Sequence, residues 1–287
     1  MPELPEVETV RLGLSQIMVG RRFHSVHVRR RDLRVPVASD FADRLEGLTL
    51  LKLSRRAKYL IGEFDDGTVL ITHLGMSGRL LITRGTTNNR FGQFTSGAHG
   101  HQNHEHIVFD LGDGIRVRFS DPRRFGLMVL TDKSSYSSHP LICRLGPEPM
   151  ENSFNGTVLS GVLKGRKTPI KSALLDQTII SGLGNIYACE ALFEAGISPR
   201  RSSLSVQGMR ADKLATAIKE VLLRAIKAGG SSLRDHIAPS GEKGYFQHSF
   251  SVYGREGQRC PNYACIKSIK RINQAGRSTF FCSACQK

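Results

Sequence analysis

Tryptophan is absent from this 287-residue sequence, and aromatic residues make up only 7% of it. No apolar run reaches the 18 or so residues that a membrane-spanning helix needs. The first residues include glutamates where a secretory signal would carry lysines, so we expect no signal peptide and a cytoplasmic protein. Acidic residues are also scarce, 25 against 41 lysines and arginines, which leaves a formal net charge of +16. This excess favours a polyanionic partner, and nucleic acid explains it better than a membrane surface does.

Cysteine is the next scarce residue, with six copies. Cys143 and Cys189 stand alone and are interpreted as buried, unreactive thiols. The other four close the chain with the spacing C-x4-C-x16-C-x2-C, and they are Cys260, Cys265, Cys282 and Cys285. Two such pairs favour one structural Zn²⁺ ion. Two disulfides are the alternative, but nothing else in the sequence indicates an oxidising compartment.

The segment between the two cysteine pairs contains KSIKRINQAGRSTFF, in which apolar and polar residues alternate around a turn. This pattern predicts a β-hairpin with Arg277 at its tip. From Gly254 onward the chain has seven lysines or arginines and one acid, Glu256. We expect a hairpin with this charge to contact phosphates.

The spacing of apolar residues changes along the chain. It is helical from Glu6 to Met18, with Pro5 suited to a first turn. Short β-branched or aromatic runs between about Arg22 and Leu130 predict about eight strands and a β-sandwich. Helical spacing returns later, most clearly in ADKLATAIKEVLLRAIKAGG, a helix that Gly229 should end.

These patterns predict an α+β multidomain protein. The divisions are an N-terminal β-sandwich with a flanking helix (1–132), a Ser- and Pro-rich linker (133–150), a helical domain (151–240) and a terminal segment with the zinc hairpin (241–287).

Two motifs allow a second interpretation. Gly182 and Gly184 in SGLGNIYACEALF make half of a dinucleotide-binding fingerprint, but Tyr187 replaces its third small residue. A helix that begins at Asn185, with an Asn cap and a phosphate at its N-terminus, fits the segment better. The histidines of AHGHQNHEH could hold a second metal, although an exposed loop before a strand is the simpler interpretation.

Several motifs occur in one order along essentially the whole chain: MPELPEVETV, RRAKYL, HLGMSG, DPRRFG, LGPEP, IKSALLDQ, GLGNIYACEALF, AGISP and the terminal cysteine pairs. In this the sequence resembles the bacterial formamidopyrimidine-DNA glycosylase family. Endonuclease VIII has the same architecture but typically has Gly in place of Leu4. The resemblance implies a β-sandwich, a helix-two-turn-helix module and a zinc finger, with double-stranded DNA held between the domains.

The resemblance also implies an activity. Family members are bifunctional DNA glycosylases and abasic-site lyases of base excision repair, acting on 8-oxoguanine and formamidopyrimidines. Once Met1 is removed, the secondary amine of Pro2 would form a Schiff base with the damaged nucleotide, and Glu3 would transfer protons. Lys58 would assist excision and elimination. Arg277 would bind a phosphate at the lesion and support the second, δ elimination.

Other positions match DNA contacts of the family. Met76, Arg123 and Phe125 would fill the gap left by the extruded nucleotide. The positions that match phosphate contacts are His104, Arg166, Lys171 and Asn185. The implied protein is a bacterial, nucleoid-associated monomer with one structural Zn²⁺ and no organic cofactor.

The sequence departs from the family in two places. Its first cysteine pair is spaced x4 instead of the common x2, and Glu242 or Lys243 occupies the neighbourhood that covers the flipped base. Two alternatives therefore stay open: an endonuclease VIII-like preference for oxidised pyrimidines, and a zinc-finger DNA-binding protein without catalysis.

Overall fold

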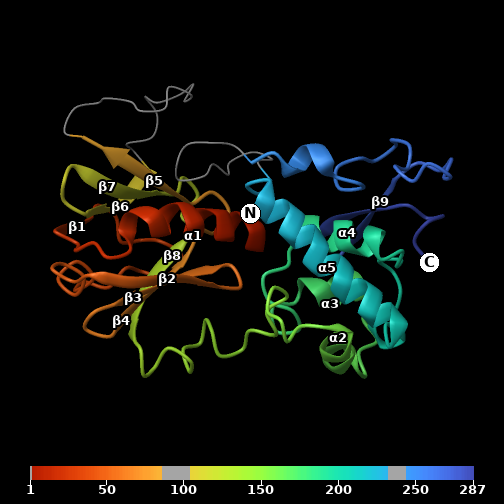
Figure 1. Ribbon diagram of the computed structural model, residues 1–287, viewed down its shortest axis with the longest axis horizontal. Coiled ribbons are helices and arrows are strands. Elements are labelled where there is room, and N and C mark those ends of the chain that lie inside the picture. Colours follow the sequence, from red (N-terminus) through yellow and green to blue (C-terminus); the bar gives the residue numbers. More distant parts are fainter. Residues whose placement is uncertain (1, 86–103, 232–243) are drawn as a thin grey trace. The chain divides into compact units, whose positions relative to one another are not determined.

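The computed structural model describes residues 2–85, 104–231 and 244–287. The chain forms two compact units, drawn in Figure 1. The first combines Met1–Cys143 with Ala228–Tyr245, and the second combines Arg144–Lys227 with Phe246–Lys287. In the part of the chain that the structure describes, no helix has the length and apolar character needed to span a membrane.

The first unit consists of helix α1 (Leu4–Met18) and two four-stranded antiparallel sheets. The order in one sheet is β1 (Ser25–Val28), β6 (Glu105–Asp110), β7 (Ile115–Ser120) and β5 (Arg79–Arg84). The order in the other is β2 (Leu50–Arg56), β3 (Tyr59–Phe64), β4 (Thr68–His73) and β8 (Leu127–Asp132). The predicted β-sandwich of about eight strands is therefore confirmed in the residues that the structure describes.

The core of the first unit is built from α1 and both sheets. The buried face of the helix presents Val7, Val10 and Leu14, the residues whose spacing predicted it. Phe23 lies at the centre, with its ring centroid 5.0 Å from that of Phe64 and 5.3 Å from that of Phe109. Each fully buried aromatic side chain stabilises such a core by about 1.5–3 kcal/mol, so this cluster holds the two sheets and the helix together.

The second unit is helical with a terminal hairpin. Its helices are α2 (Gly156–Leu163), α3 (Ile170–Leu175), α4 (Asn185–Glu194) and α5 (Met209–Lys227), with short 3₁₀ turns at Ser203–Ser205 and Phe246–Ser249. Helices α2 and α4 pack on α5, and α3 packs on α4. The hairpin strands are β9 (Lys270–Gln274) and β10 (Arg277–Phe281).

Two local expectations need correction. Helix α4 begins at Asn185 as predicted, but its N-cap is Gly184, and the Asn185 side chain donates to the carbonyl oxygen of Ser278 instead of capping the helix. Cys189 is buried, whereas Cys143 is exposed because it lies in an irregular segment at the surface of the first unit. An isolated cysteine in a sequence does not reveal which of these two surroundings it has.

Candidate active site and DNA-contacting residues

The start of α1 buries the first two described residues, Pro2 and Glu3. The Glu6 carboxylate accepts a hydrogen bond from the Glu3 backbone N–H at 2.8 Å, as in a capping box. Its other oxygen accepts from the backbone N–H of Ser231 at 2.8 Å and from the Ser231 hydroxyl at 2.9 Å. Glu6 therefore joins the start of the chain to a segment 225 residues away.

The segment around Ser231 approaches α1 closely. Gly230 has φ of +80°, and a Cβ added to it would lie 3.1 Å from the Glu6 side chain. Ser231 forms a β-bridge with Tyr245, so the two ends of the intervening segment are held next to each other. Glu242 and Lys243, like Met1, lie outside the described residues.

Lys58 lies in the turn between β2 and β3, where its side chain is 6% exposed. Arg55 ties this turn to α1, because its guanidinium contacts the Glu8 carboxylate at 3.0 Å and donates to the Ala57 carbonyl oxygen at 3.0 Å. Although burial works the other way, hydrogen bonds and charges from Arg11 and Arg55 hold the pKa of Glu8 below its ordinary value. A charged Glu8 therefore anchors the lysine turn to the helix that starts beside Pro2.

If Lys58 assists base excision, as the family resemblance implies, Glu8→Gln should lower excision roughly 10-fold, because displacing a catalytic group by less than an ångström has effects of this order. The free energy of unfolding should fall by about 1.5–3 kcal/mol with the loss of hydrogen bonds to a charged group. Single-turnover kinetics and urea unfolding measure both effects.

The matched control is Glu63→Gln, which removes a carboxylate that pairs with the exposed Lys52 and Lys133 at 3.5 and 3.4 Å. It should change stability by less than about 1 kcal/mol. Equal effects of both variants on excision would contradict the role of Glu8.

His73 is the last residue of β4, and it faces Tyr59, the first residue of the neighbouring strand β3. Burial, the charge of Lys58 and the charge of Arg34 lower the pKa of His73 to about 4. Its Nδ1 accepts the backbone N–H of Gly75 at 3.0 Å, as only an unprotonated nitrogen does. Near neutral pH this histidine is therefore uncharged and adds no further positive charge beside Lys58.

His73 predicts a pH dependence of stability. Because its pKa is about 4 in the folded chain and near 6.5 in the unfolded one, only the unfolded chain gains the proton between these values. Stability is then complete above pH 6.5 and falls toward pH 4, by up to about 1.4 kcal/mol per pH unit.

Urea unfolding between pH 4 and 7 measures this slope. In His73→Asn, whose amide oxygen can still accept the Gly75 N–H, stability should depend less steeply on pH. The control is His27→Asn, at an exposed position of β1, which should leave the slope of stability against pH unchanged. An unchanged slope in His73→Asn would show that other groups cause it.

Two loops of the first unit present Met76, Arg123 and Phe125. Met76 is 38% exposed and Phe125 is 45% exposed. The Arg123 guanidinium lies over the Phe125 ring, 4.8 Å from its centroid. A Cβ on Gly75 would lie 2.4 Å from the Phe125 carbonyl carbon, so the loops are in contact at a position where only glycine fits. The structure thus places the expected gap-filling residues together on one surface.

Asp121 is fully buried and makes hydrogen bonds to both of these loops. Its carboxylate accepts from the Ser77 hydroxyl at 2.5 Å and from the Gly126 backbone N–H at 2.8 Å. The Ser77 hydroxyl oxygen in turn accepts the Arg123 backbone N–H at 3.2 Å. These bonds fix the backbone of both loops, so Met76 and Phe125 are exposed on a rigid base.

Residues expected to contact DNA in the second unit have different surroundings. Arg277 is exposed at the first position of β10, after a turn in which Ala275 and Gly276 have positive φ. Arg166 is exposed after α2, and its side chain donates to the Val162 carbonyl oxygen at 2.9 Å. Lys171 is 0% exposed, and its ammonium donates to Thr279, so the expected phosphate contact is not available to it.

The four terminal cysteines form a cluster whose sulfur atoms all lie within 4.8 Å of one another. Sγ of Cys260 is 3.8 Å from that of Cys285, and Sγ of Cys265 is 3.7 Å from that of Cys282. Four Zn–S bonds of about 2.3 Å in a tetrahedron place neighbouring sulfurs about 3.8 Å apart. The cluster is compatible with a structural zinc site.

The wide x4 loop does not disturb this arrangement. Asn262 accepts the Ala264 backbone N–H through its side chain at 3.2 Å and the Cys265 backbone N–H through its carbonyl at 2.9 Å. Although burial works the other way, backbone N–H groups of Cys285 and Ala284 lower the pKa of Cys282 to about 7. Burial and the neighbouring thiols raise the pKa values of Cys260 and Cys285, so the lowered value belongs to one thiol of the cluster.

Comparison with known proteins supports one family over the whole chain. The family model of the formamidopyrimidine-DNA glycosylase N-terminal domain matches residues 1–128, and that of the H2TH domain matches residues 145–236. Proteins called formamidopyrimidine-DNA glycosylase from Azorhizobium caulinodans and Beijerinckia indica are 50% and 51% identical, each covered in full by the whole of this chain.

The chain belongs to the formamidopyrimidine-DNA glycosylase family.

Solved structures of this glycosylase family have the same fold. A Lactococcus lactis FPG mutant in complex with a Fapy-dG containing DNA is 33% identical, with a TM-score of 0.86 and full coverage of both chains. The MutM (FPG) protein from Thermus thermophilus is 37% identical, with a TM-score of 0.83 over 99% of this chain and 98% of the other. The four-cysteine hairpin and the two-unit organisation of this chain therefore occur in a glycosylase fold.

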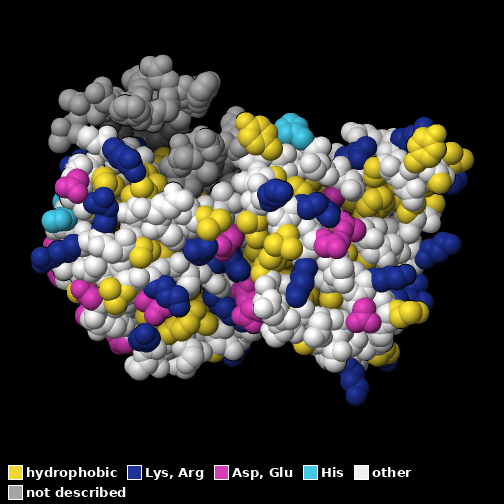
Figure 2. All heavy atoms as spheres, viewed as in Figure 1, with side chains coloured by type: hydrophobic (Ala, Val, Ile, Leu, Met, Phe, Trp, Pro, Cys, Tyr) yellow, Lys and Arg dark blue, Asp and Glu magenta, His cyan; other side chains and the backbone are white. Residues whose placement is uncertain are grey.

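Basic side chains are spread over the surface of this glycosylase family member, as the face in Figure 2 shows for each unit.

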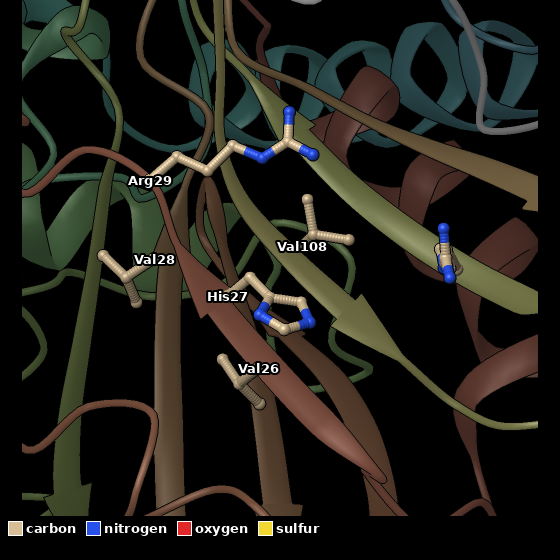
Figure 3. Close-up of a pocket in the computed structure, with 6 residues that line it drawn as sticks. Val26, His27, Val28, Arg29 and Val108 are labelled. Carbon is tan, nitrogen blue, oxygen red and sulfur yellow. The ribbon is translucent and has the colours of Figure 1, made fainter.

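A cavity of about 590 Å³ opens on the sheet β1-β6-β7-β5 (Figure 3). It is lined by His27, Arg29 and Arg116 together with Val26, Val28 and Val108. Glu105 pairs with Arg29 and Asp110 with Arg116, both at 3.0 Å, and none of the lining residues was predicted for the site.

Three further residues support the start of α1 and the loops of Met76 and Phe125, and none of them was predicted from the sequence as a site residue. Glu6 is a buried carboxylate that fixes the start of α1, and Asp121 is one that fixes the loops of Met76 and Phe125. The E-x-x-E spacing of Glu3 and Glu6 is a capping-box signal for the first, whereas no local signal marks Asp121. His106 is also buried and bonds the Asp121 carbonyl oxygen at 2.8 Å, while His104 is partly exposed at the entry to β6.

Proposed function

We propose that this protein is a bifunctional DNA glycosylase and abasic-site lyase of base excision repair that removes 8-oxoguanine and formamidopyrimidines. The observation that carries the proposal is the buried start of α1, where Pro2 and Glu3 share a unit with the buried Lys58. The Glu8, Arg55 and Ala57 contacts tie the lysine turn to this helix. Family relatives that bear the glycosylase name support the same activity.

The proposed nucleophile is the nitrogen of Pro2 after removal of Met1. An ordinary α-amino group titrates near 7.7–8, so a useful fraction is free base at neutral pH. The charge of Lys58 would increase this fraction. The nitrogen attacks C1′ of the damaged nucleotide and displaces the base, which leaves with a proton. The nitrogen then loses its own proton, and its lone pair breaks the C1′–O4′ bond, so that the sugar ring opens to a protonated O4′ hydroxyl and an iminium ion. Glu3 transfers protons at the sugar ring.

The iminium ion then accepts electrons during strand cleavage. Loss of a C2′ proton expels the 3′ phosphate, and a second elimination expels the 5′ phosphate. Arg277 binds a phosphate near the lesion during this δ step. Met76 and Phe125 fill the space that the extruded nucleotide leaves, and Arg123 hydrogen-bonds the unpaired partner base.

The cysteine cluster would hold one Zn²⁺ through Cys260, Cys265, Cys282 and Cys285. Such an ion would be structural and would hold the hairpin that carries Arg277, and the proposed excision chemistry uses no organic cofactor. His104, Arg166 and Asn185 complete the proposed phosphate contacts. The proposed division of the chain is 1–132, 133–150, 151–240 and 241–287, and the protein acts as a monomer in the bacterial cytoplasm, on the nucleoid.

Borohydride trapping on duplexes with single lesions tests the proposal. A covalent adduct with 8-oxoguanine and formamidopyrimidine duplexes, together with products of both eliminations, is the expected result. Faster trapping on oxidised pyrimidines would indicate an endonuclease VIII-like preference. Tight lesion binding without any adduct would indicate a DNA-binding protein that lacks catalysis.

A further inference from the structure

Lys171 in α3 of the second unit is 0% exposed, although lysines rarely lie fully inside a protein. Its Nζ donates to Thr279 Oγ1 at 2.6 Å and to the Ser278 carbonyl oxygen at 3.2 Å. Burying an ammonium group costs several kcal/mol unless it is well hydrogen-bonded. The fold keeps this amino group inside, where both acceptors belong to β10.

The Ser278 carbonyl oxygen has a second donor. Nδ2 of Asn185, the first residue of α4, reaches it at 2.9 Å, so side chains of α3 and α4 converge on one acceptor in β10. Thr279, the other acceptor of Lys171, is itself fully buried. Donors and acceptors are more than 90 residues apart in the sequence, so these bonds connect the helices to the hairpin.

The connection lies directly after Arg277. A two-stranded hairpin is marginal by itself and needs support from its surroundings. Arg277 pairs with Gln274 at the turn, and its guanidinium is exposed, whereas Ser278 and Thr279 are the next two residues of the same strand. Fixing the carbonyl of Ser278 therefore limits the movement of the Arg277 backbone.

We propose that Lys171 is a positioning residue for Arg277: its buried ammonium fixes β10 from α3 and so sets where the arginine is presented to DNA. Lys171 then acts without touching DNA. The inference rests on the proposed role of Arg277 in the δ elimination.

The first experiment uses the free protein and does not depend on catalysis. Hydrogen–deuterium exchange of residues 270–281 is compared among the wild type, Lys171→Met and Lys171→Gln, with zinc content measured in each. Lys171→Met should increase exchange at the Arg277 end of β10, and Lys171→Gln, which keeps N–H donors without the charge, should partly restore protection. Unchanged exchange in Lys171→Met would overturn the proposal, and an equal increase in both variants would contradict a role of N–H donation.

The second experiment is a double-mutant comparison on an abasic-site duplex. Lys171→Met should lower the ratio of δ to β product by about 10- to 100-fold, as expected for a displaced catalytic group. In the Arg277→Ala background it should lower the ratio no further. The control Lys213→Met removes an exposed charge from α5 and should leave the ratio unchanged.

The salt dependence of DNA binding separates positioning from a direct phosphate contact. If Lys171 contacted a phosphate, Lys171→Met in the Arg277→Ala background would still reduce the slope of log K against log salt by about 0.9, which would overturn the proposal. If Arg277→Ala alone leaves the products unchanged, the proposed role of Arg277 fails, and the exchange experiment still decides whether Lys171 fixes the strand.

Discussion

A protein that keeps one residue in front of Pro2 is expected to bind lesion-containing DNA normally and to form no borohydride adduct. The extra residue turns the Pro2 nitrogen into an amide, whose lone pair is delocalised and cannot attack C1′. Removal of a nucleophile costs more than about 10³-fold in rate. Single-turnover excision and trapping, with N-terminal mass spectrometry to establish the processed form, measure this loss.

The matched control is the same protein after a protease has removed the extra residue, which should restore trapping. Pro2→Gly keeps an amine at the terminus and should retain part of the activity. An undiminished adduct in the extended protein would show that another amine reacts. Lys58→Met would then test the lysine whose side chain is 6% exposed.

Replacing Cys282 by serine is expected to abolish zinc binding and to disorder the hairpin. Cys282 is fully buried, and its sulfur lies 3.7 Å from that of Cys265. Structural zinc sites of this kind contribute on the order of 10 kcal/mol to the folding of their modules, far more than a two-stranded hairpin can replace. We expect the affinity for lesion DNA to fall by roughly 100-fold as the basic hairpin is lost.

Metal analysis and DNA titration measure these effects. Cys143→Ser is the control, because this thiol is exposed and separate from the cluster, and it should change neither zinc content nor affinity. Full zinc content in Cys282→Ser would contradict the four-thiolate site. Normal DNA affinity in a protein without zinc would show that the hairpin does not need the ion.

The sequence predicted the elements of this fold well because their signals are local. Short runs of β-branched and aromatic residues mark strands and helical spacing marks helices, and in the described residues the sandwich strands and α5 lie where these patterns predicted them. The cysteine spacing also predicted the cluster, since each pair lies on a tight turn and the intervening hairpin brings the pairs together. The x4 spacing was tolerated because Asn262 organises the longer loop.

Surroundings that depend on distant partners were not predictable. Cys143 is exposed and Lys171 is buried, contrary to expectation, because the spacing of a residue does not say which distant element covers it. Asp121 supports the loops of Met76 and Phe125 through Ser77, 44 residues earlier in the chain. The catalytic and DNA-contacting roles of the named residues stay predictions.

The sequence by itself determined the helices and strands, the basic charge and the four cysteines that could bind a metal ion, because each depends on neighbouring residues or on composition. Only the tertiary structure decided that Glu6 joins the start of α1 to Ser231 and that α3 and α4 fix the strand after Arg277. These contacts connect residues that are 93 to 225 positions apart. Their pairing follows from how the whole chain packs, since a buried charge or carbonyl must find its partner wherever the fold places one.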